Sequence, residues 1–195
     1  GYRNPALQAK IADTIDEISG GRLVLGLGAG WHEPEYEMFG YPFDHRVSRF
    51  AEAIAIIHGL LRTGHVDFVG EYYSARDCEL RPRGPRPEGP PIVIGSTAPR
   101  MLSLLAKYGD IWNAWARQTL EELAEDREKV DAAMELAGRD PASVERTVSL
   151  LVDAPTATGR PSEAKPGLKA RDPEELANHL LSLSLIHISE PTRPY

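Results

Sequence analysis

The chain has a single cysteine, Cys78, and no hydrophobic run near the roughly 20 residues that a membrane-spanning helix needs. One cysteine cannot form a disulfide within the chain, which excludes a disulfide-stapled extracellular fold and favours the cytoplasm. The formal net charge of −7 disfavours a nucleic-acid-binding surface. The remaining composition, 42% hydrophobic and 26% charged, is that of one ordinary soluble globular domain.

The most informative stretch runs from residue 22 to residue 50, RLVLGLGAGWHEPEYEMFGYPFDHRVSRF. Residues 22–27 are apolar at nearly every position, which is typical of a strand buried on both faces of a parallel sheet. Gly26, Gly28 and Gly30 then lie at the strand's carboxyl end, where parallel-sheet enzymes hold ligands. Glycines there let a flat ligand approach the backbone. We therefore predict a ligand-facing rim, with tight strand-end packing as the alternative.

Two known motifs resemble this stretch, and the sequence fits neither of them. A dinucleotide-binding fingerprint, G-x-G-x-x-G, needs a glycine where Trp31 stands and an immediate helix, which Pro34 and Gly40 are expected to interrupt. His32 begins a segment like the zinc motif H-E-x-x-H, but Tyr36 occupies the position of the second histidine. No metal site is predicted.

Apolar strands alternate with amphipathic helices along most of the chain, which predicts parallel βαβ units. The predicted strands are residues 22–27, 92–94, 111–115 and 146–152. The predicted helices are residues 5–18, 47–62, 99–107 and 119–136, with another that starts at residue 172. A hairpin is predicted over residues 66–80 and a loop over residues 33–44. In the first helix, Leu7, Ile11, Ile15 and Ile18 form one apolar stripe, which we expect to be its buried face.

A second glycine-containing segment lies at the end of the strand at residues 92–94. Gly95, Ser96 and Thr97 follow that strand, and Pro99 begins a helix. Backbone N–H groups and hydroxyls at a helix N-terminus suit a phosphate, although the same pattern also describes an ordinary helix start. On the next strand, Asn113 or Trp115 is expected to line a pocket floor, and the alternative is that the strand only contributes Trp112 to the core.

Three segments in this order resemble the bacterial luciferase-like superfamily: SGGRLVLGLGAGW, HEPEYEMFGYPFDHRVSRFAEAIAIIHGLL and VDFVGEYYSARDCELRPRGPRPEGPPIVIGSTAPRMLSLLAKYGDIWNAW. The resemblance covers most of residues 2–181. Members of this superfamily are flavin- or coenzyme F-420-dependent oxidoreductases on a TIM barrel. A full (β/α)8 barrel takes roughly 250 residues. The resemblance therefore implies an α/β fold that is a partial TIM (β/α)8 barrel, lacking roughly the first three strands and the last.

The resemblance also implies a function, which is hydride transfer between coenzyme F-420 and a small organic substrate. An FMN-dependent monooxygenase and a non-catalytic flavin-binding relative are the alternatives. The implied cofactor-binding residues are Gly28, Gly30, Trp31, Gly95, Ser96, Thr97 and Asn113. His32 is the candidate catalytic residue, as a polar contact or proton donor near the cofactor ring, and an exposed loop histidine is the alternative. The expected partner is a small-molecule substrate, with neither nucleic acid nor membrane, and with a homodimer as one assembly of the full-length protein.

The C-terminal residues 183–195, LSLIHISEPTRPY, do not continue the preceding helical pattern. They resemble the translation of a transposase-type sequencing-library adapter, and an irregular natural tail is the alternative. We therefore expect residues 1–182 to be an incomplete luciferase-like barrel domain and residues 183–195 to be a non-native tail.

Overall fold

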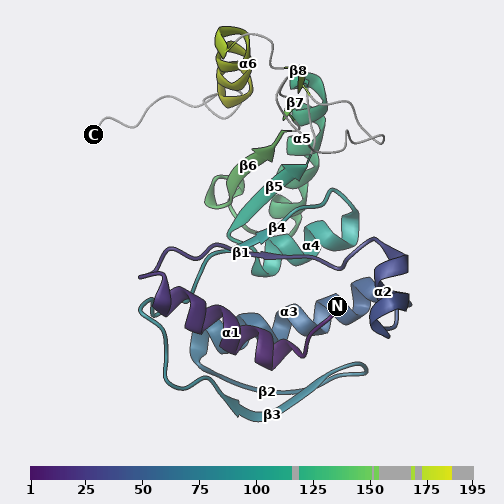
Figure 1. Ribbon diagram of the computed structural model, residues 1–195, viewed down its shortest axis with the longest axis vertical. Helices are drawn as coiled ribbons and strands as arrows, with labels where there is room; N and C mark the ends of the chain where they lie inside the picture. The colour runs from purple at the N-terminus through teal and green to yellow at the C-terminus, as the bar shows by residue number, and fades with distance from the viewer. Residues whose placement is uncertain (116–118, 151, 154–167, 170–172, 186–195) are drawn as a thin grey trace.

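The computed structural model of the chain describes residues 1–115, 119–150, 152–153, 168–169 and 173–185 (Figure 1). Its central sheet has four parallel strands in the order β1-β4-β5-β6, which is also their order along the chain. Their bounds are Leu25–Leu27 for β1, Ile92–Ile94 for β4, Ile111–Trp115 for β5 and Glu145–Ser149 for β6. Crossovers between parallel strands of one sheet are right-handed as a rule, and with the strands in chain order this rule places the connecting helices on one side of the sheet. The predicted parallel βαβ arrangement is confirmed.

Strand β1 is shorter than the sequence predicts, because pairing starts only at Leu25. The Leu25 N–H donates to the Pro91 carbonyl at 2.8 Å, whereas the Leu23 N–H donates to Asp16 Oδ1 at 3.1 Å. Val24 is 51% exposed. An apolar run therefore marks where the strand lies but not where its ladder begins.

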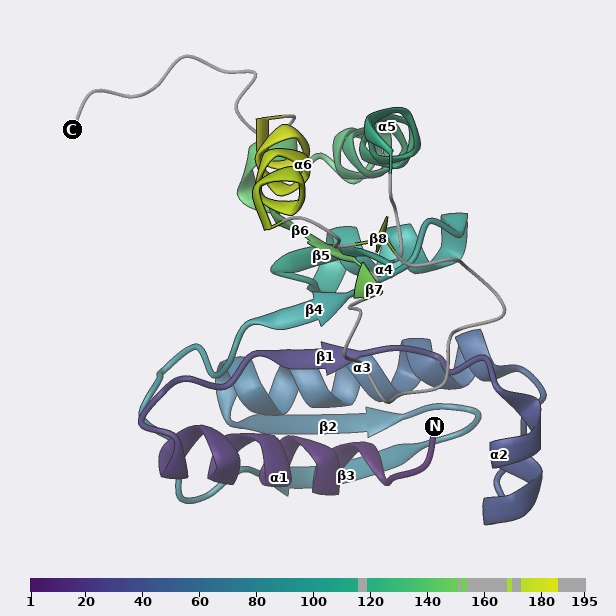
Figure 2. The same ribbon diagram turned by 45° about the horizontal axis from the view of Figure 1, so that its top comes forward.

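Four long helices lie side by side in the order α1, α3, α4, α5 (Figure 2). They span Pro5–Ile18, Arg46–Thr63, Pro99–Tyr108 and Leu120–Leu136, and a further helix, α6, spans Pro173–Leu185. The Asn4 side chain caps α1, and the Thr119 hydroxyl caps α5 by accepting from the Glu122 N–H at 3.2 Å. A short 3-10 turn, η1, covers Pro141–Ser143. Within the described ranges, no helix combines the length and the apolar character needed to cross a membrane.

The predicted buried face of α1 is wrong. Leu7, Ile15 and Ile18 are 55%, 46% and 82% exposed, whereas Ala9 and Ala12 are fully covered. The small alanines let α1 lie close to α3, and a stripe of larger residues on that side would hold the two helices apart. The face that packs is therefore chosen by fit and not by hydrophobicity alone.

The predicted loop at residues 33–44 is also wrong in its first half, because a helix, α2, spans Glu33–Phe39. Pro34 lies in the first turn of α2, where a missing N–H breaks no helical hydrogen bond. Gly40 ends α2 in the left-handed conformation at φ 72°, and its N–H returns to carbonyls of the last turn. Residues taken as interruptions are in fact the start and the end signal of a short helix.

The predicted hairpin is confirmed as the antiparallel pair β2 (His65–Val69) and β3 (Ser74–Glu79). Its turn is held by Glu52 of α3, whose carboxylate accepts the N–H groups of Glu71, Tyr72 and Tyr73 at 2.8–2.9 Å. Burial opposes ionisation of Glu52, but these three hydrogen bonds and the nearby Arg49 together lower the pKa of its carboxyl.

The hydrophobic core has two adjoining parts. One lies between the sheet and α4 and α5, and its largest fully buried side chain is Trp112. The other joins α1, α3 and the hairpin. Beside the second part, the 1% exposed Asp16 carboxylate accepts from Arg86 Nε at 2.8 Å and from an Arg86 Nη at 2.6 Å. This ion pair holds the connection before β4 against α1.

The C-terminal end of the described chain differs from the sequence expectation. Helix α6 continues to Leu185, and Leu183 is 1% exposed and belongs to the sheet-side core. The helical pattern therefore does not stop at residue 183. Residues 186–195 lie outside the described residues, so the non-native origin of the tail stays a prediction. Strand β6 ends at Ser149, and Val152, the last residue of the strand predicted at 146–152, belongs to a separate two-residue parallel pair, β7 (Val152–Asp153) with β8 (Leu168–Lys169).

We predict that Glu52→Gln lowers the free energy of unfolding at pH 7 by about 1–3 kcal/mol, because the hairpin turn loses charge-assisted hydrogen bonds. The carboxyl pKa is lower in the folded state, so its contribution exists above the ordinary value of 4.5 and is lost as pH falls through the lowered one. Urea unfolding should therefore separate the variant from the natural protein at pH 7, with a difference that shrinks below pH 4.5 and disappears only below the lowered pKa of the folded state. Glu128→Gln, an exposed position on α5, is the matched control and should change little.

Candidate functional site

The carboxyl ends of β1, β4, β5 and β6 lie at one edge of the sheet, because the strands are parallel. Ile92, Ile94 and Trp112 point toward the helices and are buried. Their neighbours in sequence, such as Val93 and Asn113, therefore face the other side of the sheet. A Cβ built on Gly26 or Gly28 would meet no atom within 4 Å on this second face, so the face is open beside β1.

The exit of β4 is closely fitted to β5. A Cβ on Gly95 would lie 3.0 Å from the Asn113 carbonyl oxygen, so glycine allows this approach. The indole Nε1 of Trp112 donates to the Ser96 carbonyl at 3.1 Å, and the Ser96 hydroxyl accepts from the Ala98 N–H at 3.2 Å. The loop before α4 is therefore held by two hydrogen bonds, one from the buried indole of Trp112 and one to the hydroxyl of its own Ser96.

Two cavities, of about 270 Å³ and about 320 Å³, lie near this edge of the sheet. The cavity of about 320 Å³, which we call the β4–β5 cavity, is lined by Gly95, Ser96, Thr97, Trp112, Asn113, Ala114, Trp115 and Asp126. Four of the predicted cofactor-binding residues, Gly95, Ser96, Thr97 and Asn113, thus share one cavity.

Asn113 is held by two hydroxyl groups that the sequence analysis did not single out. Its Oδ1 lies 2.9 Å from Thr147 Oγ1 and 3.2 Å from Ser149 Oγ. Thr147 and Ser149 pair in register with Asn113 and Trp115 on the neighbouring strand, so all four lie on one face. The sequence could have indicated these hydroxyls, because Thr147 and Ser149 are two residues apart and side chains at that spacing share one face of a strand.

The predicted residues after β1 do not form a single group with those after β4. Gly28 lines a separate hollow of about 180 Å³ beside β1. Gly30, Trp31 and His32 are absent from the lining of the β4–β5 cavity in the described part of the chain. Trp31 is 82% exposed, and its ring is tilted by 60° to the His32 ring at a centroid separation of 5.0 Å.

Gly30 and His32 have clear local roles in the structure. Gly30 has a φ of 76°, and the Tyr36 hydroxyl packs against it while donating to the Ala29 carbonyl at 2.7 Å. His32 is the residue that precedes the first turn of α2, and its side chain makes no cap hydrogen bond there. Gly30 is thus required for packing, and the ring of His32 is not used to cap α2.

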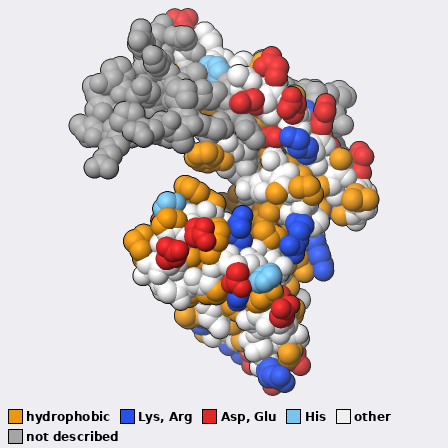
Figure 3. All heavy atoms as spheres, turned by 90° about the vertical axis from the view of Figure 1, so that its right-hand side faces the viewer, with side chains coloured by type: hydrophobic (Ala, Val, Ile, Leu, Met, Phe, Trp, Pro, Cys, Tyr) orange, Lys and Arg blue, Asp and Glu red, His pale blue; other side chains and the backbone are white. Residues whose placement is uncertain are grey.

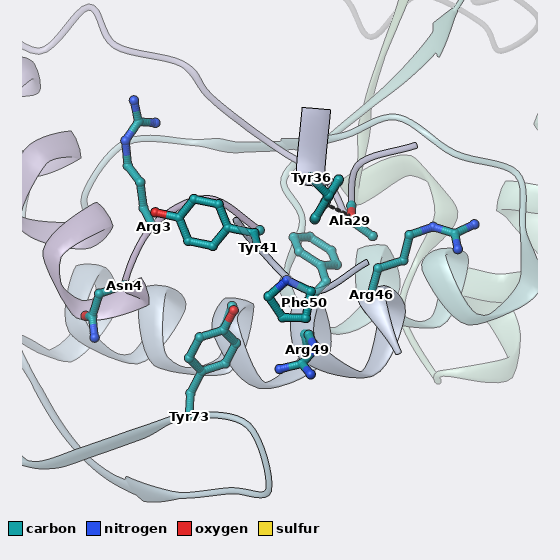
Figure 4. A pocket seen from close by; sticks show the side chains of 12 residues that line it. Arg3, Asn4, Ala29, Tyr36, Tyr41, Arg46, Arg49, Phe50 and Tyr73 are labelled. Atoms are coloured by element: carbon teal, nitrogen blue, oxygen red, sulfur yellow. Dashed lines mark hydrogen bonds between the residues drawn. The ribbon is translucent and has the colours of Figure 1, made fainter. Parts of the chain in front are cut away.

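The second cavity, of about 270 Å³, lies beside the segment that follows β1, between α2, α3 and the hairpin turn (Figure 4). Four of its twelve lining residues are aromatic, and three of these, Tyr41, Phe50 and Tyr73, come from different segments of the chain. Arg46 and Arg49 of the first turns of α3 also line it. We call this cavity the aromatic pocket.

Among the residues that the structure describes, no group of three or more His, Cys, Asp or Glu side chains is placed to hold a metal ion. The side chains that the structure does bring together are hydroxyl, amide, aromatic and guanidinium groups. Such a set can bind an anion or a planar molecule.

We predict that Gly30→Ala destabilises the protein by about 2–4 kcal/mol, because it adds left-handed backbone strain and a collision with the Tyr36 hydroxyl. Gly28→Ala is the matched control. Gly28 is not among the glycines with positive φ and its added methyl meets open space, so a change within about 0.5 kcal/mol is expected. Urea unfolding measures both. Equal losses would contradict the distinct roles of the two glycines.

Comparison with known proteins places this geometry in a family. Residues 1–164 match the family model described as luciferase-like monooxygenase. The chain is 34% identical over 143 residues to the pyrimidine monooxygenase RutA of Cronobacter sakazakii, covering 70% of this chain and 42% of that protein. It is 37% identical over 138 residues to the 5,10-methylenetetrahydromethanopterin reductase of Archaeoglobus fulgidus, covering 70% and 40%. The chain thus spans about two fifths of these relatives.

Solved structures agree on the fold. A crystal structure of the long-chain alkane monooxygenase LadA superposes with a TM-score of 0.68 at 16% identity, covering 77% of this chain and 40% of that chain. An F420-dependent secondary alcohol dehydrogenase gives a TM-score of 0.67 at 22% identity, covering 94% and 58%. These are luciferase-like TIM-barrel proteins of which the chain covers about half, as expected for a partial barrel. The match over residues 1–164 and the parallel sheet with its row of helices lead to one conclusion: the chain belongs to the luciferase-like monooxygenase family.

Proposed function

We propose that the full-length protein is an oxidoreductase that transfers hydride between coenzyme F-420 and a small organic substrate, with the cofactor held at the carboxyl edge of β4 and β5. The observation that carries the proposal is the β4–β5 cavity, where Gly95, Ser96, Thr97 and Asn113 meet at the start of α4. When bound, such a cofactor supplies the hydride chemistry, and the protein binds and orients it.

The residues at the start of α4 fit a phosphate group. The backbone N–H groups of Thr97 and Arg100 find no acceptor among the described residues. The Ser96 and Thr97 hydroxyls lie in the same loop, and the exposed Arg100 side chain reaches Ser48 Oγ at 3.0 Å. Free N–H donors at the positive end of a helix favour an anion. These groups would hold the cofactor phosphate.

The open face beside β1 and the amide of Asn113 fit a planar ring. Gly26 and Gly28 present no side chain, so a flat ring can lie close to the backbone. Thr147 and Ser149 occupy the Oδ1 of Asn113, which leaves its Nδ2 hydrogens for a carbonyl oxygen of the ring. His32 and Trp31 stay proposals for the outer rim, with His32 as a polar contact or proton donor.

The relatives support two cofactors. The 37% identical reductase favours the main proposal, in which the enzyme transfers hydride with coenzyme F-420. The RutA relatives favour the second candidate, an FMN-dependent monooxygenase. The further parts of the proposal are a small-molecule substrate, a homodimer in the full-length protein and a cytoplasmic location, the last supported by the single Cys78.

The cofactor is tested by titrating the full-length protein with F-420 and with FMN while recording absorbance and fluorescence. Binding of F-420 with reduction by a hydride donor supports the main proposal. Preferential binding of FMN with oxygen-dependent turnover supports the monooxygenase instead. A protein that binds neither cofactor is a non-catalytic relative, and the proposal is then wrong.

We predict that Ser96→Asp weakens cofactor binding at least about tenfold, because a carboxylate would stand against the phosphate. Ser103→Asp makes the same charge change at an exposed position in the second turn of α4, so it is the matched control and should bind nearly normally. Equal affinities for both variants and the natural protein would count against a phosphate at this loop. The dissociation constants should be measured at low and at high salt, since screening reduces the difference.

A further inference from the structure

We propose that the aromatic pocket is the substrate site and that it selects a single aromatic ring bearing a carboxylate. This inference rests on the proposed function, because the pocket becomes a substrate site only beside a bound cofactor. The side chains that carry the inference are Tyr41, Phe50, Tyr73, Arg3, Arg46 and Arg49.

The position of the pocket connects it to the carboxyl edge of the sheet. Ala29, which directly follows the β1 exit, lines the pocket, and its carbonyl accepts the hydroxyl of the buried Tyr36. Phe50 lines both the aromatic pocket and the hollow beside Gly28. A ligand in the pocket would therefore lie next to the face on which the cofactor ring is proposed to rest.

Two of the three aromatic walls are held in place before any ligand arrives, and the third, Tyr41, is 40% exposed. Phe50 is 6% exposed on α3, and Tyr73 is carried by the hairpin turn whose N–H groups bond to Glu52. Next to it, the Arg49 guanidinium lies 4.5 Å from the centre of the Tyr72 ring. In Figure 4 the Tyr41 and Tyr73 side chains lie on opposite sides of the pocket, and Phe50 lies between them. Rigid aromatic walls bind a planar ring at low entropic cost.

The rim of the pocket is positively charged although the whole chain has a net charge of −7. Arg49 is paired with Asp44 at 3.2 Å, whereas Arg3 and Arg46 have no carboxylate partner among the described residues. The first turn of α3, where Arg46 lies, contains no acidic residue. Figure 3 shows that both basic and acidic side chains lie among hydrophobic ones on this side of the molecule, whereas all the ionisable side chains that line the pocket, apart from tyrosines, are arginines. A guanidinium binds a carboxylate through two parallel hydrogen bonds.

The size of the pocket limits the ligand. Its volume of about 270 Å³ is just below the roughly 300–1,000 Å³ of typical small-molecule sites. One ring with a short acidic substituent fits this space and uses both features, with the ring between the aromatic walls and the carboxylate at the arginine rim. In Figure 4 the Arg3 and Arg46 side chains lie at opposite ends of the pocket and point outward, so the carboxylate would reach one end of it.

The test is calorimetric titration of the full-length protein with benzoate, benzamide and cyclohexanecarboxylate. Benzoate should bind at least about fivefold more tightly than either analogue, because only benzoate has both the ring and the charge. Arg46→Gln should weaken benzoate about tenfold and leave benzamide nearly unchanged. Arg3→Gln, at an exposed position, tests the other end of the rim without risk to folding. Arg76→Gln, on the outer strand of the hairpin, is the matched control and should have no effect.

Equal binding of the three probes, or selective benzoate binding that neither arginine variant changes, overturns the inference. Cofactor titration of the same protein separates the two proposals. A protein that binds cofactor but shows no benzoate selectivity disproves the pocket assignment alone. A protein that selects benzoate but binds neither F-420 nor FMN disproves the proposed function and with it the substrate role.

Discussion

Parallel pairing imposes the constraint on which the rest of this structure depends. After each strand the chain must cross back to the starting edge, and each of the long helices from α3 to α5 takes part in such a return. Consequently all four strands of the central sheet end at the same edge, and segments as distant in sequence as Gly28 and Ser96 leave the sheet at that edge. The row of helices and the open opposite face are two results of one pairing rule. The candidate site therefore belongs to the topology and not to any single motif.

Carboxylates at partly or fully buried positions hold the connections in place around this frame. Asp16 receives Arg86 and the Leu23 N–H, and so joins α1 to the segments before β1 and β4. Asp110 accepts from Arg62 and from the Ile92 N–H, which fixes the start of β4 against α3. Glu52 does the same for the hairpin turn. Each acid satisfies backbone donors that the turns leave without partners, which is the main requirement for irregular chain at a buried site.

The sequence predicts the regular parts of the fold well and the surfaces less well. Strands β4 and β5 agree with the prediction to the residue, because each is a short apolar run between clear stop signals. The face of α1 is mispredicted because alanine is weakly hydrophobic yet decides how closely helices pack. Helix α2 is missed because proline is favoured in the first turn of a helix, where Pro34 lies, but breaks the interior of a helix. Thr147 and Ser149 are missed because their relation to Asn113 exists only across strands.

Trp112 links the packing of the core to the position of the loop that precedes α4. Its ring fills the core beneath the sheet, while its indole nitrogen holds the carbonyl of the loop that precedes α4. A substitution that repacks this part of the core therefore also releases Ser96. Engineering for thermostability at this position would also move the loop before α4, and selection on the conformation of that loop would change the melting temperature. At the indole, the stability of the core and the shape of the β4–β5 cavity cannot evolve independently.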